Sequence, residues 1–225
     1  MIELIFALVI MGIVFLTLPL ILIQNADSVE DNIIQESIFL SSSKMSQLLT
    51  FQWDENSKEA GIILSAADVL TVSATGDDEL DRNLSDFRRG HFREDKHRRM
   101  TPVNNERNAS AAVGLEGALY DDIDDFDGIV DFDVIVLPAD STGGYKKNYR
   151  ADVNVTYVTD DTNYTANPVN FAFTTAYPGG TTNLKMIETS IAQDRTGAGD
   201  WDPNFVLLRA YVANIGETGY FKRRY

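Results

Sequence analysis

A run of uncharged residues near the amino terminus, Leu4–Ile23, constrains the fold of this chain more than any other feature. At about 1.5 Å per residue, a helix of this length spans roughly 30 Å, the thickness of the hydrocarbon core of a bilayer. A secretory signal peptide has a shorter apolar core, a basic start and a small-residue cleavage site. No Lys or Arg precedes this run, and Gln24-Asn25 is a poor cleavage site. The sequence therefore predicts a retained transmembrane helix over residues 1–24.

The charges that follow the run predict its orientation. Asp27, Glu30, Asp31 and Glu36 follow it closely, whereas the first basic residue is Lys44. Because Lys and Arg mark the cytoplasmic side of a membrane helix, we expect this flank to face away from the cytoplasm. The rest of the chain is then exported.

Apolar residues recur at three- and four-residue steps beyond the run, which predicts that the helix continues to about residue 53. They are Ala26, Val29, Ile33, Ile34, Ile38, Met45, Leu48 and Leu49. A helix of this length is roughly 75 Å long. Its second half, residues 25–55, offers one apolar stripe to a globular domain.

After Trp53 the pattern changes to short apolar segments separated by Gly, Asn, Pro and Thr clusters, which indicates strands and turns. The expected strands are Ile62–Leu64, Val69–Val72, Ile129–Leu137, Asp152–Val158, Phe171–Tyr177, Leu184–Ser190 and Phe205–Ala213. The clean alternation of Asp152–Val158 is typical of a sheet with one wet face. We therefore expect an α+β fold in which the long helix packs on an antiparallel sheet in a head domain over residues 56–225.

The residues around the apolar run also form a motif. Met1-Ile2-Glu3-Leu4-Ile5-Phe6, followed by an apolar helix, resembles the start of mature bacterial type IV pilins and type II secretion pseudopilins. In that family a leader is removed before an N-methylated residue, usually Phe, and an IEL-type tripeptide follows. The family's usual Phe-Thr pair is absent from this sequence, so Met1 corresponds to the third mature position. The resemblance covers residues 1–25.

The resemblance implies a homo-oligomeric helical filament of type IV pilus type, used in surface attachment or motility. Its subunits are stored in the inner membrane and moved into the extracellular filament by inner-membrane assembly machinery. The family also contains major pilins, minor pilins and pseudopilins, and the sequence leaves the choice among them open.

Glu3 is the only charged residue before Asp27. The resemblance implies that it pairs with the amino-terminal amine of a neighbouring subunit, since one partner in one register removes the cost of a charge in an apolar bundle. The alternative is an acid at headgroup level, favoured there by the helix dipole. Gly12 and Pro19 weaken the middle of the helix and predict a break or bend when subunits pack. The alternative for these two is an ordinary kink that a membrane helix tolerates.

An acidic run predicts a cation site. Residues 121–133 hold seven carboxylates and no basic residue, and dense carboxylate oxygen favours Ca²⁺. The run is not an EF-hand, because the best register places Ile123 at the first ligand position and Val134 at the last. The expected ligands are Asp122, Asp124, Asp125 and Asp127. The alternative is that these acids build turns and pair with Arg88, Arg89, Arg98 or Arg99.

A basic segment precedes the acidic run. Residues 82–107 contain eight of the nineteen basic residues and both histidines. We interpret the segment as a solvent-exposed surface segment whose basic residues balance the charge of the acidic run. A contact with single-stranded DNA is the alternative, but a net charge of −15 argues against nucleic-acid binding. His91 and His97 lack nearby carboxylates in a helical frame and are not expected to bind metal.

Four Asn-X-Ser/Thr sequons predict N-linked glycans. They lie at Asn83, Asn108, Asn154 and Asn163, and an acid stands two positions before each: Asp81, Glu106, Asp152 and Asp161. This extended pattern is similar to the acceptor site of bacterial oligosaccharyltransferases. Glycans require exposed positions and passage outside the cytoplasm, which agrees with the expected orientation.

Catalysis is not expected. The chain has no Cys, its two His residues lie in one basic stretch, and it shows no nucleophile elbow. No cofactor is required, with Ca²⁺ and covalent glycans as the expected additions. The leading hypothesis is a structural filament subunit. The alternatives are a secretion pseudopilin and a signal-anchored exported module that binds calcium or another ligand.

Overall fold

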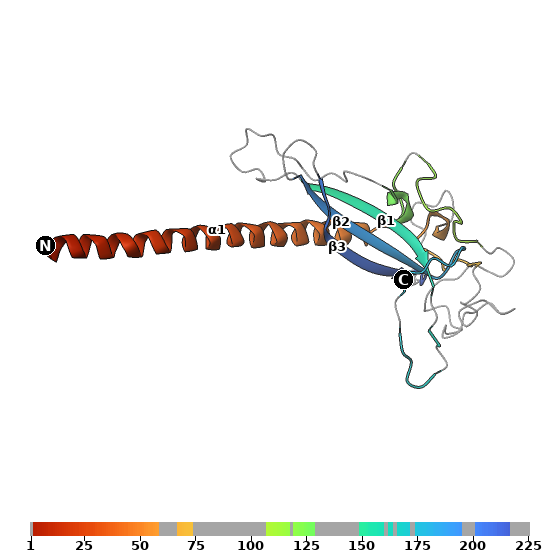
Figure 1. The fold of residues 1–225 in the computed structure, drawn as a ribbon. Coiled ribbons are helices and arrows are strands. Elements are labelled where there is room, and N and C mark those ends of the chain that lie inside the picture. Colours follow the sequence, from red (N-terminus) through yellow and green to blue (C-terminus); the bar gives the residue numbers. More distant parts are fainter. Residues whose placement is uncertain are drawn as a thin grey trace, which may run out of the picture.

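The chain has an α+β fold in which one long helix lies against a three-stranded antiparallel sheet (Figure 1). The computed structural model describes residues 2–58, 67–73, 107–117, 119–128, 149–159, 162–163, 166–171, 174–194 and 201–216. Of Asp194 and residues 201–205 it describes the backbone alone.

The helix α1 runs without interruption over Ile2–Leu48. Among the described residues, it is the one helix that is long and apolar enough to cross a membrane. It passes through Gly12 and Pro19 as a continuous helix, so the single chain has no break there. The break expected on subunit packing concerns an assembly and stays a prediction.

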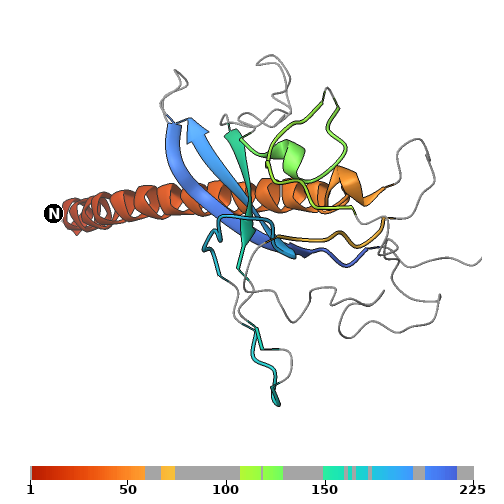
Figure 2. The same ribbon diagram turned by 90° about the vertical axis from the view of Figure 1, so that its right-hand side faces the viewer.

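The two halves of α1 have different surroundings. Every side chain over residues 2–32 is exposed, and both views show this half projecting beyond the sheet (Figure 2). Burial begins at Ile33, and the fully covered positions are Ser37, Leu40, Ser41, Met45 and Leu48. The buried stripe therefore starts later than expected, and Val29, Ile38 and Leu49 lie outside it.

The sheet has the order β1-β2-β3, with neighbouring strands antiparallel. Strand β1 spans Tyr149–Val158, β2 spans Leu184–Asp194 and β3 spans Trp201–Ala213. The register pairs Val155 with Ile187 and Ile187 with Ala210, and the β2–β3 register shifts by two residues between Ile191 and Gln193. These strands confirm the expected strands Asp152–Val158, Leu184–Ser190 and Phe205–Ala213. β1 and β3 begin earlier than expected, and β2 ends later.

Alternation along the strands gives the sheet two unlike faces. The inner face packs on α1 in two clusters. One comprises Met45, Leu48, Ile123, Phe126, Val153, Val155 and Ile187, and the other comprises Leu40, Tyr149, Ala151 and Ile191. The opposite face is polar on β1 and β2, with Asn154 exposed beside Glu188, and it carries the Arg209–Glu188 ion pair.

Polar contacts fix the register between the helix and the sheet. The Ser41 and Thr189 hydroxyls lie 2.9 Å apart in the buried interface. The Tyr149 hydroxyl donates to Glu36 Oε2 at 2.6 Å. Small side chains at Ser37 and Ser41 let the helix approach the sheet, which a purely apolar pattern does not predict.

The structure corrects two expected strands and the end of the helix. Val69–Val72 contains isolated bridges at Val69 and Thr71, the latter to Asn108, in place of a strand, and the described residues of 171–177 form no strand. The helix ends at Leu48 instead of near residue 53, because Phe51 leaves the helical path and packs on Phe126, with ring centroids 4.6 Å apart. The expected strands Ile62–Leu64 and Ile129–Leu137 lie outside the described residues.

Candidate functional site

The chain just after α1 forms one wall of a buried polar site. The Asp54 carboxylate accepts a hydrogen bond from the Asn56 backbone N–H at 3.0 Å and so caps the short 3₁₀ turn Glu55–Ser57. Its other oxygen accepts from the Ser110 N–H at 2.9 Å. The Ser110 hydroxyl also donates to Glu55 Oε1. Asp54 and Glu55 are thus positioned by backbone and hydroxyl groups.

The acidic run forms the second wall, and its aspartates divide into two groups. Asp125 Oδ2 accepts from the backbone N–H groups of Asp121 and Asp122 at 2.8 and 3.2 Å, so it builds the turn. Asp127 Oδ1 accepts from the Val155 N–H at 2.8 Å and ties the run to β1.

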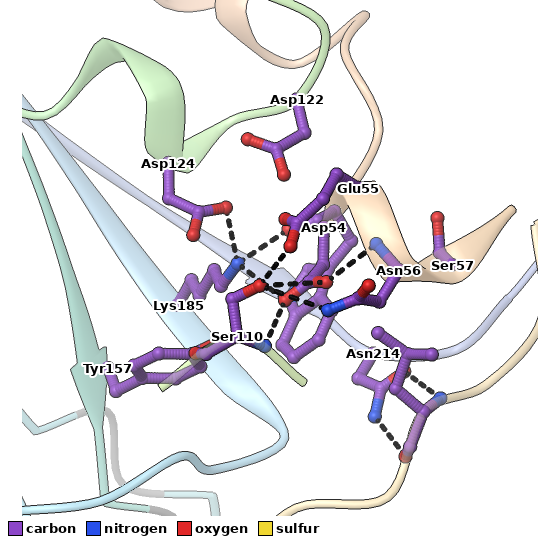
Figure 3. Close-up of polar contacts among 12 residues, drawn as sticks. Asp54, Glu55, Asn56, Ser57, Ser110, Asp122, Asp124, Tyr157, Lys185 and Asn214 are labelled. Atoms are coloured by element: carbon purple, nitrogen blue, oxygen red, sulfur yellow. Dashed lines mark hydrogen bonds and ion pairs between the residues drawn. The ribbon is translucent and has the colours of Figure 1, made fainter. Parts of the chain in front are cut away.

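Two further aspartates of the run, Asp122 and Asp124, are fully buried and face Asp54 and Glu55 (Figure 3). Hydrogen bonding brings these walls together, since the Ile123 N–H donates to the Gln52 carbonyl at 2.9 Å. The four carboxylates therefore meet although they come from separate segments of the chain.

Lys185 supplies the positive charge of the site. Its position on β2 has the same parity as Ile187 and Ile191, so the side chain points inward and is fully buried. The ammonium donates to Asp124 Oδ1 at 2.6 Å, to the Trp53 carbonyl at 2.7 Å and to Asp54 Oδ2 at 3.4 Å. It also lies 4.4 Å from the centroid of the Trp53 ring, within the range of a cation–π contact.

The carboxylates outnumber this single ammonium. Asp54, Glu55 and Asp122 bring carboxylate oxygens within 4.8 Å of one another, and Glu55, Glu116 and Asp124 do the same. Three buried oxygens in this cluster have no hydrogen-bond partner: Glu55 Oε2, Asp122 Oδ2 and Asp124 Oδ2. We call these five acids with Lys185 the carboxylate cluster.

Burial shifts the ionisation of the cluster. It raises the pKa of Asp122 to about 9, and the neighbouring Asp124 charge adds to the rise. Burial also raises the pKa of Asp54 and Asp124, although the Lys185 ammonium opposes the rise in both. The pKa of Glu116 rises to about 7 through burial and the nearby Glu55 charge.

The structure places the predicted cation ligands in two roles. Asp122 and Asp124 belong to the cluster, whereas Asp125 and Asp127 support the backbone. The sequence analysis missed Asp54, Glu55, Glu116 and Lys185. Lys185 carried a usable signal, because a Lys at the inward parity of an apolar strand needs a buried partner. The arginines proposed as partners, at 88, 89, 98 and 99, lie outside the described residues, as do both histidines.

Among the described residues, the remaining predicted site residues do not belong to the carboxylate cluster. Asn108, Asn154 and Asn163 are exposed, as an acceptor of a glycan must be, while Asn83 lies outside the described residues. Glu3 lies in the first turn of α1 and is exposed. The structure therefore leaves these positions accessible and does not bring them together.

Comparison of the chain with family models, curated proteins and solved structures finds no match. The interpretation of the carboxylate cluster and of the helix rests on the residues of this chain.

Proposed function

We propose that the chain is a structural subunit of an extracellular helical filament of type IV pilus type, stored in the inner membrane before assembly. The observation that carries the proposal is the exposed apolar half of α1. This surface must be covered by lipid or protein in the cell, because a soluble monomer rarely exposes a large contiguous apolar patch. Before assembly, lipid covers the apolar half of α1. In the filament, the corresponding halves of the helices of neighbouring subunits cover it.

The charge pattern of α1 supports assembly over simple anchoring. Glu3 is the single charged side chain before Asp27, and it lies at the end of α1 farthest from the sheet. A carboxylate inside a helical bundle needs a cation, and the amino terminus of a neighbouring copy supplies one. Contacts of this kind, between different surfaces of identical subunits, generate filaments when the rotation between neighbours does not close into a ring.

The packed half of α1 also keeps apolar surface for neighbours. Phe39 is 69% exposed and Ile38 is 46% exposed, on the side of the helix away from the sheet. In the proposed filament these side chains contact adjacent subunits, while the polar outer face of the sheet meets solvent. The glycans proposed at Asn108, Asn154 and Asn163 extend from exposed positions of the head.

Substitution of Glu3 tests the proposal. Glu3→Ala is expected to abolish surface fibres while the subunit accumulates in the inner membrane, and Glu30→Ala serves as the matched control on the exposed helix. Electron microscopy of sheared fibres and immunoblots of membrane fractions give the two readouts. Fibres from Glu3→Ala cells at the wild-type level would contradict the proposal. The intact mass of the subunit from the same fibres tests the glycans.

A membrane-anchored module that binds a cation is the second candidate function. The carboxylate cluster favours it, since such a site needs no assembly. For this function Glu3→Ala leaves the subunit and its binding unchanged, and no fibres form in the wild type.

A further inference from the structure

We propose that the carboxylate cluster is a Ca²⁺ site that ties the end of α1 to the head, with Glu55 at its centre and Asp54, Asp122, Asp124 and Glu116 around it. The site is independent of filament formation, because all its residues belong to one chain. It also differs from the site expected from the sequence, since Asp125 and Asp127 are not ligands.

The unpartnered oxygens are the first argument. Asp122 and Asp124 are both fully buried, yet Oδ2 of each has no hydrogen-bond partner. Buried carboxylate oxygens are nearly always satisfied, since each unsatisfied one carries its full desolvation cost. Glu55 Oε2 is in the same condition and comes from the opposite wall. A cation among these oxygens would satisfy all three.

The geometry is the second argument. Glu55 belongs to both groups of three carboxylates whose oxygens lie within 4.8 Å of one another. One ion beside Glu55 can therefore take oxygens from the segment after α1, from Glu116 and from the acidic run. Figure 3 shows Asp54, Glu55, Asp122 and Asp124 facing a common space above Lys185.

Lys185 positions two carboxylates of the site and does not satisfy all of their oxygens. Its ammonium engages Asp124 Oδ1 and Asp54 Oδ2, which holds both side chains in place and leaves Asp124 Oδ2 without a partner. Five carboxylates against one ammonium leave an excess of negative charge that a divalent cation offsets. The turn bonds of Asp125 and Asp127 fix the backbone that carries Asp122 and Asp124.

The donor atoms select the ion. All are carboxylate oxygens, which are hard ligands, and the chain has no Cys. Ca²⁺ accepts six to eight such oxygens in irregular geometry, whereas Mg²⁺ requires a near-ideal octahedron and retains its waters. A site assembled from three loop segments suits Ca²⁺. In a chain without disulfides, the ion acts as a cross-link between these segments.

Thermal unfolding of the full chain in detergent micelles tests the proposal. Saturating Ca²⁺ is expected to raise Tm by about 5–10 °C over the value in chelator, with a much smaller effect of Mg²⁺. Calorimetric titration with Ca²⁺ should give one site per chain. An unchanged Tm together with no binding heat would overturn the proposal. It would mean that bound protons, and not a metal ion, neutralise the carboxylates of the cluster.

Isosteric variants locate the site. Glu55→Gln and Asp122→Asn are expected to lose the Ca²⁺-dependent rise in Tm, while Asp127→Asn keeps it because its amide oxygen can still accept from Val155. Glu116→Gln, at an exposed position where folding is not at risk, should weaken Ca²⁺ binding at least threefold. Equal losses in Asp127→Asn and Glu55→Gln, or wild-type affinity in both Glu55→Gln and Glu116→Gln, would place the ion elsewhere.

Terbium luminescence gives a readout that does not depend on stability. Tb³⁺ is a Ca²⁺ substitute that emits when excited through a nearby indole, and Trp53 borders the cluster. We expect sensitised emission from the full chain that excess Ca²⁺ displaces, and its loss in Trp53→Phe but not in Trp201→Phe. Because Tyr157 also borders the cluster, the indole is excited selectively, and emission that then persists in Trp53→Phe would contradict the assigned position.

Discussion

The two halves of α1 differ in what covers them, although both belong to one continuous helix. Over residues 2–32 the side chains are all exposed, and those from Leu4 to Ile23 are uncharged and almost all apolar, whereas from Ile33 to Leu48 the helix contains serines and charges and yet packs on the sheet. The more polar half is therefore the one buried within the chain. The comparison teaches that apolar content alone does not identify intramolecular packing, because the most apolar surface can belong to a partner outside the chain.

Removing the buried charge of Lys185, which lies on β2 beside the chain that follows the packed half of α1, should have the largest effect on stability. Lys185→Met leaves the buried Asp54 and Asp124 carboxylates without their cation, and we expect the free energy of unfolding in chelator to fall by about 3–5 kcal/mol. Arg209→Met removes an ion pair whose Arg side chain is 46% exposed, and should cost below about 1 kcal/mol. Denaturant unfolding of both variants measures the difference. Similar costs would mean that the buried pair contributes no more than the surface pair.

Truncation of an apolar side chain tests the two halves directly. Ile187→Ala opens a cavity opposite Met45 and Leu48 and is expected to cost about 2–4 kcal/mol. Leu16→Ala in the projecting half, where the side chain is 73% exposed, should change the stability of the head by less than about 0.5 kcal/mol. Denaturant unfolding in detergent is the measurement. A large loss in Leu16→Ala would show that the projecting half contributes to the folding of the head.

The pH dependence of stability should also distinguish the halves. Folding raises the pKa of Asp122 to about 9 and that of Glu116 to about 7. The folded state therefore binds more protons than the unfolded state, so stability in chelator should fall as the pH rises from about 5 to about 9. Asp122→Asn is expected to flatten this dependence, whereas Leu16→Ala in the projecting half leaves it unchanged. Thermal melts across the pH range check both, and a stability that rises with pH would contradict the sign.

The smallest expected effect concerns the polar contacts of the packed half. Ser41→Ala leaves the buried Thr189 hydroxyl without its partner and should cost about 1 kcal/mol. Its neighbour Ser42 is exposed, and Ser42→Ala should be neutral within about 0.5 kcal/mol. Equal melting temperatures for the two variants would show that the Ser41–Thr189 hydrogen bond does not stabilise the packing of the helix on the sheet.

Local patterns predicted much of the fold. The apolar run and its helical continuation give α1, and strict alternation gives β1, because each pattern lies within a single element. The end of the helix was missed because Phe51 is drawn to Phe126, a contact between distant segments. Ser41 was missed because its hydroxyl is satisfied by Thr189 on β2, which the helix sequence does not reveal, whereas the Ser37 hydroxyl bonds back to the Ile33 carbonyl of its own helix.

The carboxylate cluster was predictable only in part. The density of acids identified Asp122 and Asp124, but not their separation in role from Asp125 and Asp127, which depends on the turn they form. Asp54 and Asp124 lie 131 and 61 positions from Lys185, so their meeting follows from the packing of the sheet on α1. The inward parity of Lys185 showed that a partner was needed, without showing which one.

The acidic run also lies along the outer side of β1. The Gly128 N–H donates to the Val153 carbonyl at 3.1 Å, and Asp127 accepts from the Val155 N–H. β1 is a terminal strand of the sheet, and unpaired backbone groups on such a strand can recruit a strand from another molecule. By occupying these groups, the run protects this border of the sheet from uncontrolled strand addition.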